Sequence, residues 1–326
     1  MYSKIAKRRG IFARRGFYAE KARLFGRLLK EIYLETGFMK KERKIVYYDD
    51  ELTDEFSSAQ ITPIKINGKY RYLRDNIFEK VLSFFLYRVV ATPLSKLFLK
   101  IKFKHKIVGR EKIKKYKGAY FLYGNHTSAA ADPFIPSMVA FPKGVHVIVH
   151  PANVSMPVLG VINRYIGALP LPNDLKANKN FLQAIEKRVG ENKAICIYPE
   201  AHIWPYYTGI RPFTDRSFHY PVKYNVPAFV FTDVYKKRGK RGDKFTPQII
   251  TYVDGPFFPD GTLPAAEARK KLRDEAYSAM LKRSELSDYD MIVYLKRPAD
   301  TQCEKSGESD IGKAADCAAL KEKAFD

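Results

Sequence analysis

Between about residue 106 and residue 235, short apolar runs alternate with segments of helical periodicity, and this alternation constrains the fold most strongly. The runs expected to form buried strands cover residues 119–123, 145–149, 194–198 and 228–232. Helical patterns cover much of 132–140 and 181–189, and Gly190 is expected to stop the second helix. Alternating strands and helices favour an α/β fold with a mixed, largely parallel central sheet flanked by helices.

A histidine and an aspartate lie in the turn that follows the first expected strand. The segment reads Gly124-Asn125-His126-Thr127-Ser128-Ala129-Ala130-Ala131-Asp132-Pro133. This end of a parallel strand is where α/β proteins usually place their chemistry. His126 there is a candidate general base, and a nearby acid can orient the imidazole and stabilise its protonated form. Asp132 before a proline also has a structural explanation, as the N-cap of a helix.

A second turn with an acidic residue follows the strand at 194–198. It reads Tyr198-Pro199-Glu200-Ala201-His202. Glu200 is either an acceptor for a substrate hydroxyl or a solvated loop carboxylate, and His202 is a candidate substrate contact. An Arg211-Pro212-Phe213 block and a Val226-Pro227 pair follow in the chain.

Taken in order, these blocks resemble the glycerolipid acyltransferase family, which contains the lysophosphatidic acid acyltransferases. That family has Asn-His-x4-Asp, Gly-x-x-Phe-Ile-x-Arg, Phe-Pro-Glu-Gly-Thr-Arg-Ser and a Val-Pro strand. Over residues 106–235 this chain has Asn125-His126 with Asp132, the block Ile166-Gly167-Ala168-Leu169-Pro170-Leu171, Tyr198-Pro199-Glu200, and Val226-Pro227. The resemblance implies a glycerol-phosphate-acyltransferase-like fold, with His126 and Asp132 as catalytic residues. It implies that the substrate-binding residues include Asn125, Thr127, Ser128, Gly167, Glu200, His202 and Arg211.

Three departures from the family pattern affect the expected site. Five residues separate His126 from Asp132 where the family has four, and we expect the turn before the helix to absorb the extra residue. The family's two motif arginines are replaced, because Ala201-His202-Ile203-Trp204 stands for Gly-Thr-Arg-Ser and Asn173 falls near the other arginine position. In the family those arginines are associated with the acceptor phosphate, whose oxygens match a guanidinium fork. Candidates to replace them are Arg164, His202, Arg211 and Arg216.

The activity that the resemblance implies is direct transfer of a fatty acyl group. His126 would take the proton of an acceptor hydroxyl, which attacks the thioester of acyl-CoA or acyl-carrier protein, and the acceptor would be a lysolipid or glycerol-phosphate-type molecule. Backbone amides near Thr127 and Ser128 are candidates for stabilising the oxyanion. The thioester is a co-substrate and no cofactor is expected. No metal site is expected either, because the His and Cys residues lack ligand spacing.

Charge and apolar patterning indicate contact with an anionic membrane surface. The formal net charge is +23, and residues 1–45 hold 14 Lys and Arg against four acidic residues. Apolar residues recur at helical spacing from Phe17 to Leu34, as in a basic amphipathic helix. Residues 77–103 are apolar but interrupted by charges and Pro93, which favours two short surface helices over one membrane-spanning helix. We therefore expect a peripheral or monotopic protein on the cytoplasmic face of a membrane.

The expected organisation has four parts. Residues 1–75 form a basic amphipathic region and a polar connector or small hairpin, and 76–105 form membrane-surface helices. Residues 106–300 form the acyltransferase α/β domain, and 301–326 form a polar tail. Cys196, Cys303 and Cys317 show no paired spacing, which favours a reducing compartment.

Two other classes of function fit part of the sequence. A nucleic-acid-binding protein fits the net charge and the 14% aromatic residues, but no zinc-finger, RNA-recognition or homeodomain pattern is present. A non-catalytic membrane-binding protein on an acyltransferase scaffold fits the altered Glu200 block. A hydrolase that uses His126 on water is a closer variant of the enzyme.

Overall fold

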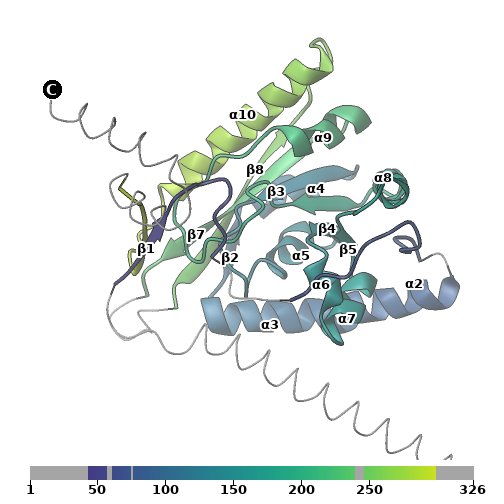
Figure 1. Cartoon of the computed structure of the whole chain (residues 1–326), viewed down its shortest axis with the longest axis horizontal. Helices are drawn as coiled ribbons and strands as arrows, with labels where there is room; N and C mark the ends of the chain where they lie inside the picture. Colours follow the sequence, from purple (N-terminus) through teal and green to yellow (C-terminus); the bar gives the residue numbers. More distant parts are fainter. Residues whose placement is uncertain (1–42, 57–60, 75, 239–245, 299–326) are drawn as a thin grey trace, which may run out of the picture.

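The computed structural model describes residues 43–56, 61–74, 76–238 and 246–298. The amphipathic helix expected between Phe17 and Leu34 and the polar tail from residue 301 lie outside these residues, as do Cys303 and Cys317. Figure 1 shows a large central sheet with helices packed around it.

Seven strands form the central sheet in the order β2-β8-β7-β3-β6-β4-β5. They are β2 (Lys106–Val108), β3 (Tyr120–Gly124), β4 (Val145–Val149), β5 (Ala168–Pro170), β6 (Ala194–Ile197), β7 (Ala228–Lys236) and β8 (Gln248–Phe257). Every neighbouring pair is parallel except β7 with β8. The predicted mixed, largely parallel sheet is confirmed, and β3, β4, β6 and β7 lie where apolar runs predicted strands.

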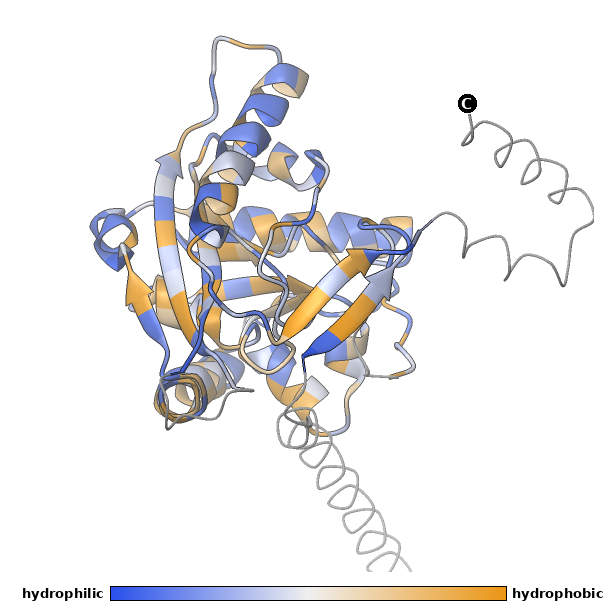
Figure 2. Ribbon diagram, turned by 90° about the vertical axis from the view of Figure 1, so that its left-hand side faces the viewer, coloured by the Kyte–Doolittle hydropathy of each residue, from blue (hydrophilic) through white to orange (hydrophobic). Residues whose placement is uncertain are grey.

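Helices cover both faces of this sheet, and the alternation of strand side chains decides what each face buries. On β3, Tyr120 and Leu122 pack against one cluster, whereas Phe121 and Tyr123 pack against the other. The first face is covered by α3 (Thr92–Phe103), α4 (Arg110–Lys115) and α5 (Ile135–Ala140), and the second by α8 (Leu175–Gly190), α9 (His219–Tyr224) and α10 (Ala265–Ser284). Hydrophobic residues accordingly recur along the strands in Figure 2.

Several shorter elements complete the described fold. The edge strand β5 is flanked by α6 (Ala152–Ser155) and α7 (Leu159–Tyr165), and a short 3-10 turn, η2 (Arg216–Phe218), precedes α9. The connector expected between residues 46 and 75 is not a hairpin. Its first strand, β1 (Lys44–Tyr48), pairs in parallel with β9 (Ile292–Lys296), because a partner from the far end of the chain satisfies its hydrogen bonds.

The helix at residues 77–103 is continuous, so the predicted break near Pro93 is wrong. It runs through α2 (Ile77–Phe84), a π-helical segment η1 (Phe85–Ala91) and α3. The Thr92 backbone N–H and its hydroxyl both donate to the Tyr87 carbonyl, the hydroxyl at 2.6 Å. The wider π turn leaves room for the ring of Pro93 at the start of α3. Its carbonyl groups also tolerate the proline's lack of an N–H donor, so the helix does not end there.

This 27-residue helix lies along one side of the domain (Figure 1). Its length and composition would suffice to cross a membrane, contrary to the expectation from sequence, and only 11% of its most apolar window is buried. Its inward stripe packs on the domain: Leu99 and Phe103 are buried, and Ser83 and Tyr87 hydrogen-bond to Tyr165 and Val145.

Candidate active site

The end of β3 is built so that the following loop passes close to β7. A Cβ on Gly124 would lie 2.1 Å from the Phe231 ring, so only glycine fits there. The next residue, Asn125, is buried and binds the backbone of Asp233 twice, donating to its carbonyl at 3.1 Å and accepting from its N–H at 2.8 Å. These contacts fix the position from which His126 leaves the strand.

His126 and Asp132 form the pair that the sequence predicts. Nδ1 of His126 lies 2.8 Å from Oδ2 of Asp132, and the histidine side chain is 19% exposed while the aspartate is 1% exposed. Residues 129–134 form turns between His126 and α5, which absorb the extra residue of the spacing. With Nδ1 bound to the carboxylate, Nε2 is the nitrogen left to accept a proton.

Tyr198, which follows β6, holds this pair from the other side. Its ring stacks on the His126 ring with centroids 4.5 Å apart, and its hydroxyl donates to the Asp132 carbonyl at 2.7 Å. The stacking fixes the plane of the imidazole, and the hydrogen bond fixes the backbone that carries its acid.

The charge on Asp132 is stabilised by local donors. Burial raises the pKa of Asp132, while the bond to His126 and the amides of Ser128 and Thr127 oppose that rise. The Ser128 amide donates to Asp132 Oδ2 at 3.0 Å. The predicted oxyanion donors near Thr127 and Ser128 are therefore directed at Asp132, because a carboxylate attracts the loop's own N–H groups.

The residues around this pair match a known family model. Residues 104–230 match the model described as Acyltransferase. These residues form a domain of the acyltransferase family. Among curated proteins, no sequence matches the chain.

The chain is also similar to a solved structure. The 1-acyl-sn-glycerophosphate (LPA) acyltransferase PlsC from Thermotoga maritima is similar over 65% of this chain and 88% of that chain. Its sequence identity is 20% and its TM-score is 0.45.

The second acidic turn of the acyltransferase domain is sealed rather than solvated. Glu200 and Arg211 form an ion pair at 3.1 Å with both side chains fully buried. Glu200 also accepts from the backbone N–H of Arg211 and from that of His126, each at 3.3 Å. Burial raises the pKa of Glu200, and Arg211 opposes that rise. Of the two alternatives for Glu200, the solvated loop carboxylate is therefore wrong, because the side chain is buried against Arg211 and the loop backbone.

Several other residues of the predicted substrate site serve the fold. Thr127 is buried and its hydroxyl lies 2.7 Å from that of Tyr235. Ser128 accepts from the Ala131 amide at 3.1 Å, which caps the turn. Gly167 has a φ of +107°, and a Cβ there would lie 2.7 Å from the Val145 carbonyl oxygen, so the backbone requires glycine at this position.

The candidate phosphate-binding side chains have different surroundings. Arg211 also donates to the His202 carbonyl and stacks 5.0 Å from the Trp204 ring, so it is held inside the domain. Arg164 donates to the Val154 carbonyl at 2.9 Å. His202 is 37% exposed and lies 3.2 Å from Glu55, which leaves it near the surface. Arg216 lies in η2 and is exposed.

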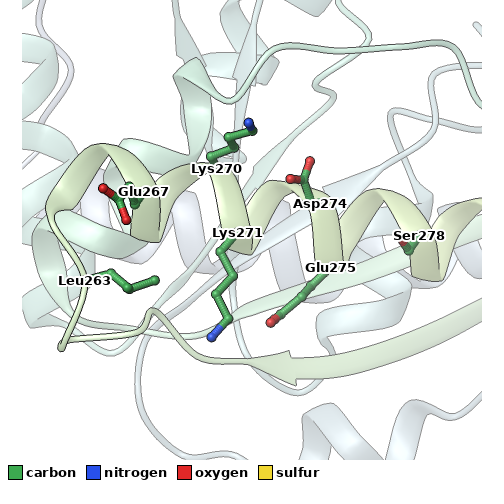
Figure 3. Close-up of a pocket in the computed structure, with 7 residues that line it drawn as sticks. All are labelled: Leu263, Glu267, Lys270, Lys271, Asp274, Glu275 and Ser278. Carbon is green, nitrogen blue, oxygen red and sulfur yellow. The ribbon is translucent and has the colours of Figure 1, made fainter.

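A hollow beside α10 is not part of this site (Figure 3). β8 ends at Phe257, which pairs with Ala228 at the start of β7, whereas Gly124 before His126 pairs with Phe231 further along. The first half of α10 therefore lies toward the opposite end of the sheet. The lining residues are Leu263, Glu267, Lys270, Lys271, Asp274, Glu275 and Ser278.

Sequence reasoning missed the contribution of Tyr198 and of Asp233. The signal for Tyr198 was its place in the Tyr198-Pro199-Glu200 block, where the family has phenylalanine. For Asp233 the signal was a charged residue inside an apolar strand, since charged residues are seldom fully buried without a reason.

Proposed function

We propose that this protein is an acyltransferase that works at a membrane surface in phospholipid biosynthesis. It moves a fatty acyl group from a thioester, acyl-CoA or acyl-carrier protein, to the hydroxyl of a lysophospholipid or glycerol-phosphate-type acceptor. The observation that carries this proposal is the His126–Asp132 pair at 2.8 Å, at the end of β3 within the acyltransferase domain.

His126 acts as the general base through Nε2. It takes the proton of the acceptor hydroxyl as the oxygen attacks the thioester carbonyl carbon, and Asp132 stabilises the imidazolium that forms. The tetrahedral intermediate then breaks its carbon–sulfur bond, and the leaving thiolate takes the proton from the imidazolium. An ester and a free thiol result, and His126 returns to its neutral form.

The outward face of the helix at 77–103 supports contact with lipid. A contiguous exposed apolar surface of this kind on a folded domain marks an interaction site. Its exposed residues are Ile77, Phe78, Val81, Leu82, Phe84, Phe85, Val89, Val90, Leu94, Leu97 and Ile101. Lys80, Lys96 and Lys100 are exposed on the same helix, where each basic side chain near an anionic leaflet contributes about 1 kcal/mol.

We place this helix in the plane of the membrane surface rather than across it. Its inward stripe, with Leu99 and Phe103 buried, packs on the domain, and a crossing helix would have to leave those contacts. The Phe98 ring on this helix packs on the Phe134 ring, with centroids 5.6 Å apart. Phe134 follows Asp132 by two residues, so the helix lies close to the catalytic loop. A lipid acceptor at the surface would then approach His126 directly. The cytoplasmic face fits the absence of paired cysteine spacing in the sequence.

The test measures thiol release from palmitoyl-CoA with liposomes and a panel of lysolipid and glycerol-phosphate acceptors. His126→Ala should lower acceptor-dependent release by about 10²–10⁴-fold, because it removes the base. His150→Ala is the matched control, because His150 follows β4 at the same end of the sheet but is exposed. Full turnover by folded His126→Ala protein would overturn the assignment.

Other outcomes identify the competing functions. Release without any acceptor would indicate a hydrolase. No release from liposome-bound protein, with acyl-carrier protein as donor as well, would favour a non-catalytic membrane-binding protein. In flotation with the same vesicles, Val81→Asp with Leu97→Asp should weaken binding. Leu175→Asp, at an 89% exposed site outside the helix, should not.

A further inference from the structure

A second buried carboxyl group lies beneath the catalytic loop. Asp233 on β7 is 2% exposed, and its backbone is the one that Asn125 binds through both N–H and C=O. Phe231 and Tyr235, two residues to either side, belong to the cluster on the α5 face of the sheet. Because strand side chains alternate, Asp233 points to this same face, which also carries Asp132.

Only one carboxyl oxygen of Asp233 accepts a hydrogen bond from a neighbouring side chain in the described part of the chain. Thr251 on β8 pairs with Asp233 in the strand register and donates its hydroxyl to Asp233 Oδ1. The same Thr251 oxygen lies 2.7 Å from Nε2 of His105. Since a hydroxyl has one proton to donate, His105 donates to Thr251 through Nε2–H. Burial lowers the pKa of His105 to about 4, so this ring brings no positive charge to Asp233 at neutral pH.

The other oxygen of Asp233 and one oxygen of Asp132 have no hydrogen-bond donor among the described residues. Among the side chains that the structure describes, Asp233 Oδ2 and Asp132 Oδ1 are both buried without a hydrogen-bond partner. The charge of Asp132 acts on Asp233. Two carboxyl groups that repel each other electrostatically in an apolar site do not both ionise, and one of them retains a proton. Asp132 has His126 and the Ser128 amide to stabilise its charge, whereas Asp233 has Thr251 alone. The proton therefore belongs on Asp233.

We propose that Asp233 is a positioning residue of the His126–Asp132 pair, which carries a proton on Oδ2 in the resting protein and shares it with Asp132 Oδ1. The shared proton orients the Asp132 carboxylate and leaves one negative charge, not two, beside the imidazole. A second charge would strengthen the hold of His126 on its proton and lower the fraction of free base. This consequence rests on the proposed function, whereas the protonated carboxyl itself does not.

Most titratable side chains around Asp132 and Asp233 are uncharged at neutral pH. Burial and the Asp132 charge raise the pKa of Asp233 well above its usual range. Burial, followed by the charge of Asp132, raises the pKa of the neighbouring Cys196, Tyr198 and Tyr235, so these three side chains stay neutral. Among the described residues, the titratable side chains near the two carboxyls are His126, Cys196, Tyr198, Tyr235 and His105.

Difference infrared spectroscopy of the full chain tests the proton without any substrate. At neutral pH the wild type should show the carbonyl band of a protonated carboxylic acid, and Asp233→Asn should lack it. Asp254→Asn is the control, because Asp254 on β8 is ion-paired to Arg283 at 2.7 Å and to Lys112 at 2.8 Å. In Thr251→Val the band should persist but move to higher frequency, because Oδ1 loses its donor. Equal spectra for wild type and Asp233→Asn would overturn the proposal.

The pH profile of kcat/KM then tests the link to His126. With a neutral Asp233, the acidic limb of Asp233→Asn should stay at the wild-type pH, because no charge is removed. An ionised Asp233 would instead give a limb shifted to lower pH in this variant, which would contradict the proposal. Asp233→Ala should lower kcat on the order of 10–100-fold, since it frees Asp132 to turn, and Asp233→Asn should recover most of that loss.

Discussion

Two loops leave neighbouring parallel strands at one end of the sheet, and each holds a buried carboxylate beside a basic side chain. After β3, Asp132 binds His126, and after β6, Glu200 binds Arg211. The histidine keeps 19% of its side chain exposed, whereas both members of the second pair are fully buried. The first loop presents a group to solvent and substrate, and the second encloses its charges.

The difference shows how one local design serves two purposes. An imidazole changes its charge near neutral pH, so a carboxylate beside it prepares proton transfer. A guanidinium keeps its charge and the Glu200–Arg211 pair is fully buried, so this pair holds the loop in place rather than transferring a proton. Because Glu200 also accepts from the backbone N–H of His126, the structural loop supports the chemical one. Ala201 next to it has a φ of +64°, the conformation that the family's glycine would adopt without strain.

Removing Arg211 should have the largest effect on stability and so break the second loop. Arg211→Met leaves Glu200 buried without its partner, and we expect a loss of about 3–5 kcal/mol in the free energy of unfolding. Adding Glu200→Gln should recover part of it, because no buried charge is then unpaired. Arg71→Met is the control, since Arg71 is 69% exposed in its pair with Glu79 and should lose only about 0–1 kcal/mol. Urea denaturation measures all three, and equal losses would contradict a sealed ion pair.

The contrast between the two loops also marks what sequence reasoning reached. The His126–Asp132 pair was predictable, because both residues lie in one short turn after a recognisable strand. The Glu200–Arg211 pair was not, because the two residues are eleven apart in an irregular segment whose path depends on packing. The same limit applies to β1 and β9, which pair although almost the whole domain separates them along the chain. The predicted helix break at Pro93 was wrong because a π turn before the proline lets the helix continue.

His105 offers a second test, since it is a buried base that stays uncharged instead of pairing with a carboxylate. The unfolded chain takes up its proton near pH 6.5, but the folded protein does so only near pH 4. As the pH falls through this window the unfolded state binds more protons, so stability should fall and then level off below pH 4. His105→Gln keeps the donor to Thr251 and should reduce that fall by about 1–3 kcal/mol.

The measurement is the urea midpoint of wild type and His105→Gln at pH 7.5, 5.5 and 4.5. Asp233, whose pKa is raised, changes stability in the opposite direction as the pH falls, but it is present in both proteins and so largely cancels. His150→Gln, at an exposed position, should follow the wild type. Parallel curves for wild type and His105→Gln would show that His105 takes its proton equally well in the folded state.

The smallest expected effect comes from Tyr198, where the two loops meet. Tyr198→Phe keeps the ring on His126 but removes the hydrogen bond to the Asp132 carbonyl, which is worth about 1 kcal/mol. Tyr294→Phe is matched, because the Tyr294 hydroxyl donates to the Pro205 carbonyl at 2.9 Å away from the catalytic pair. Both variants should lose similar stability in urea, but only Tyr198→Phe should lower kcat, by about fivefold. If both variants kept wild-type kcat, the second loop would support the fold without tuning the chemistry of the first.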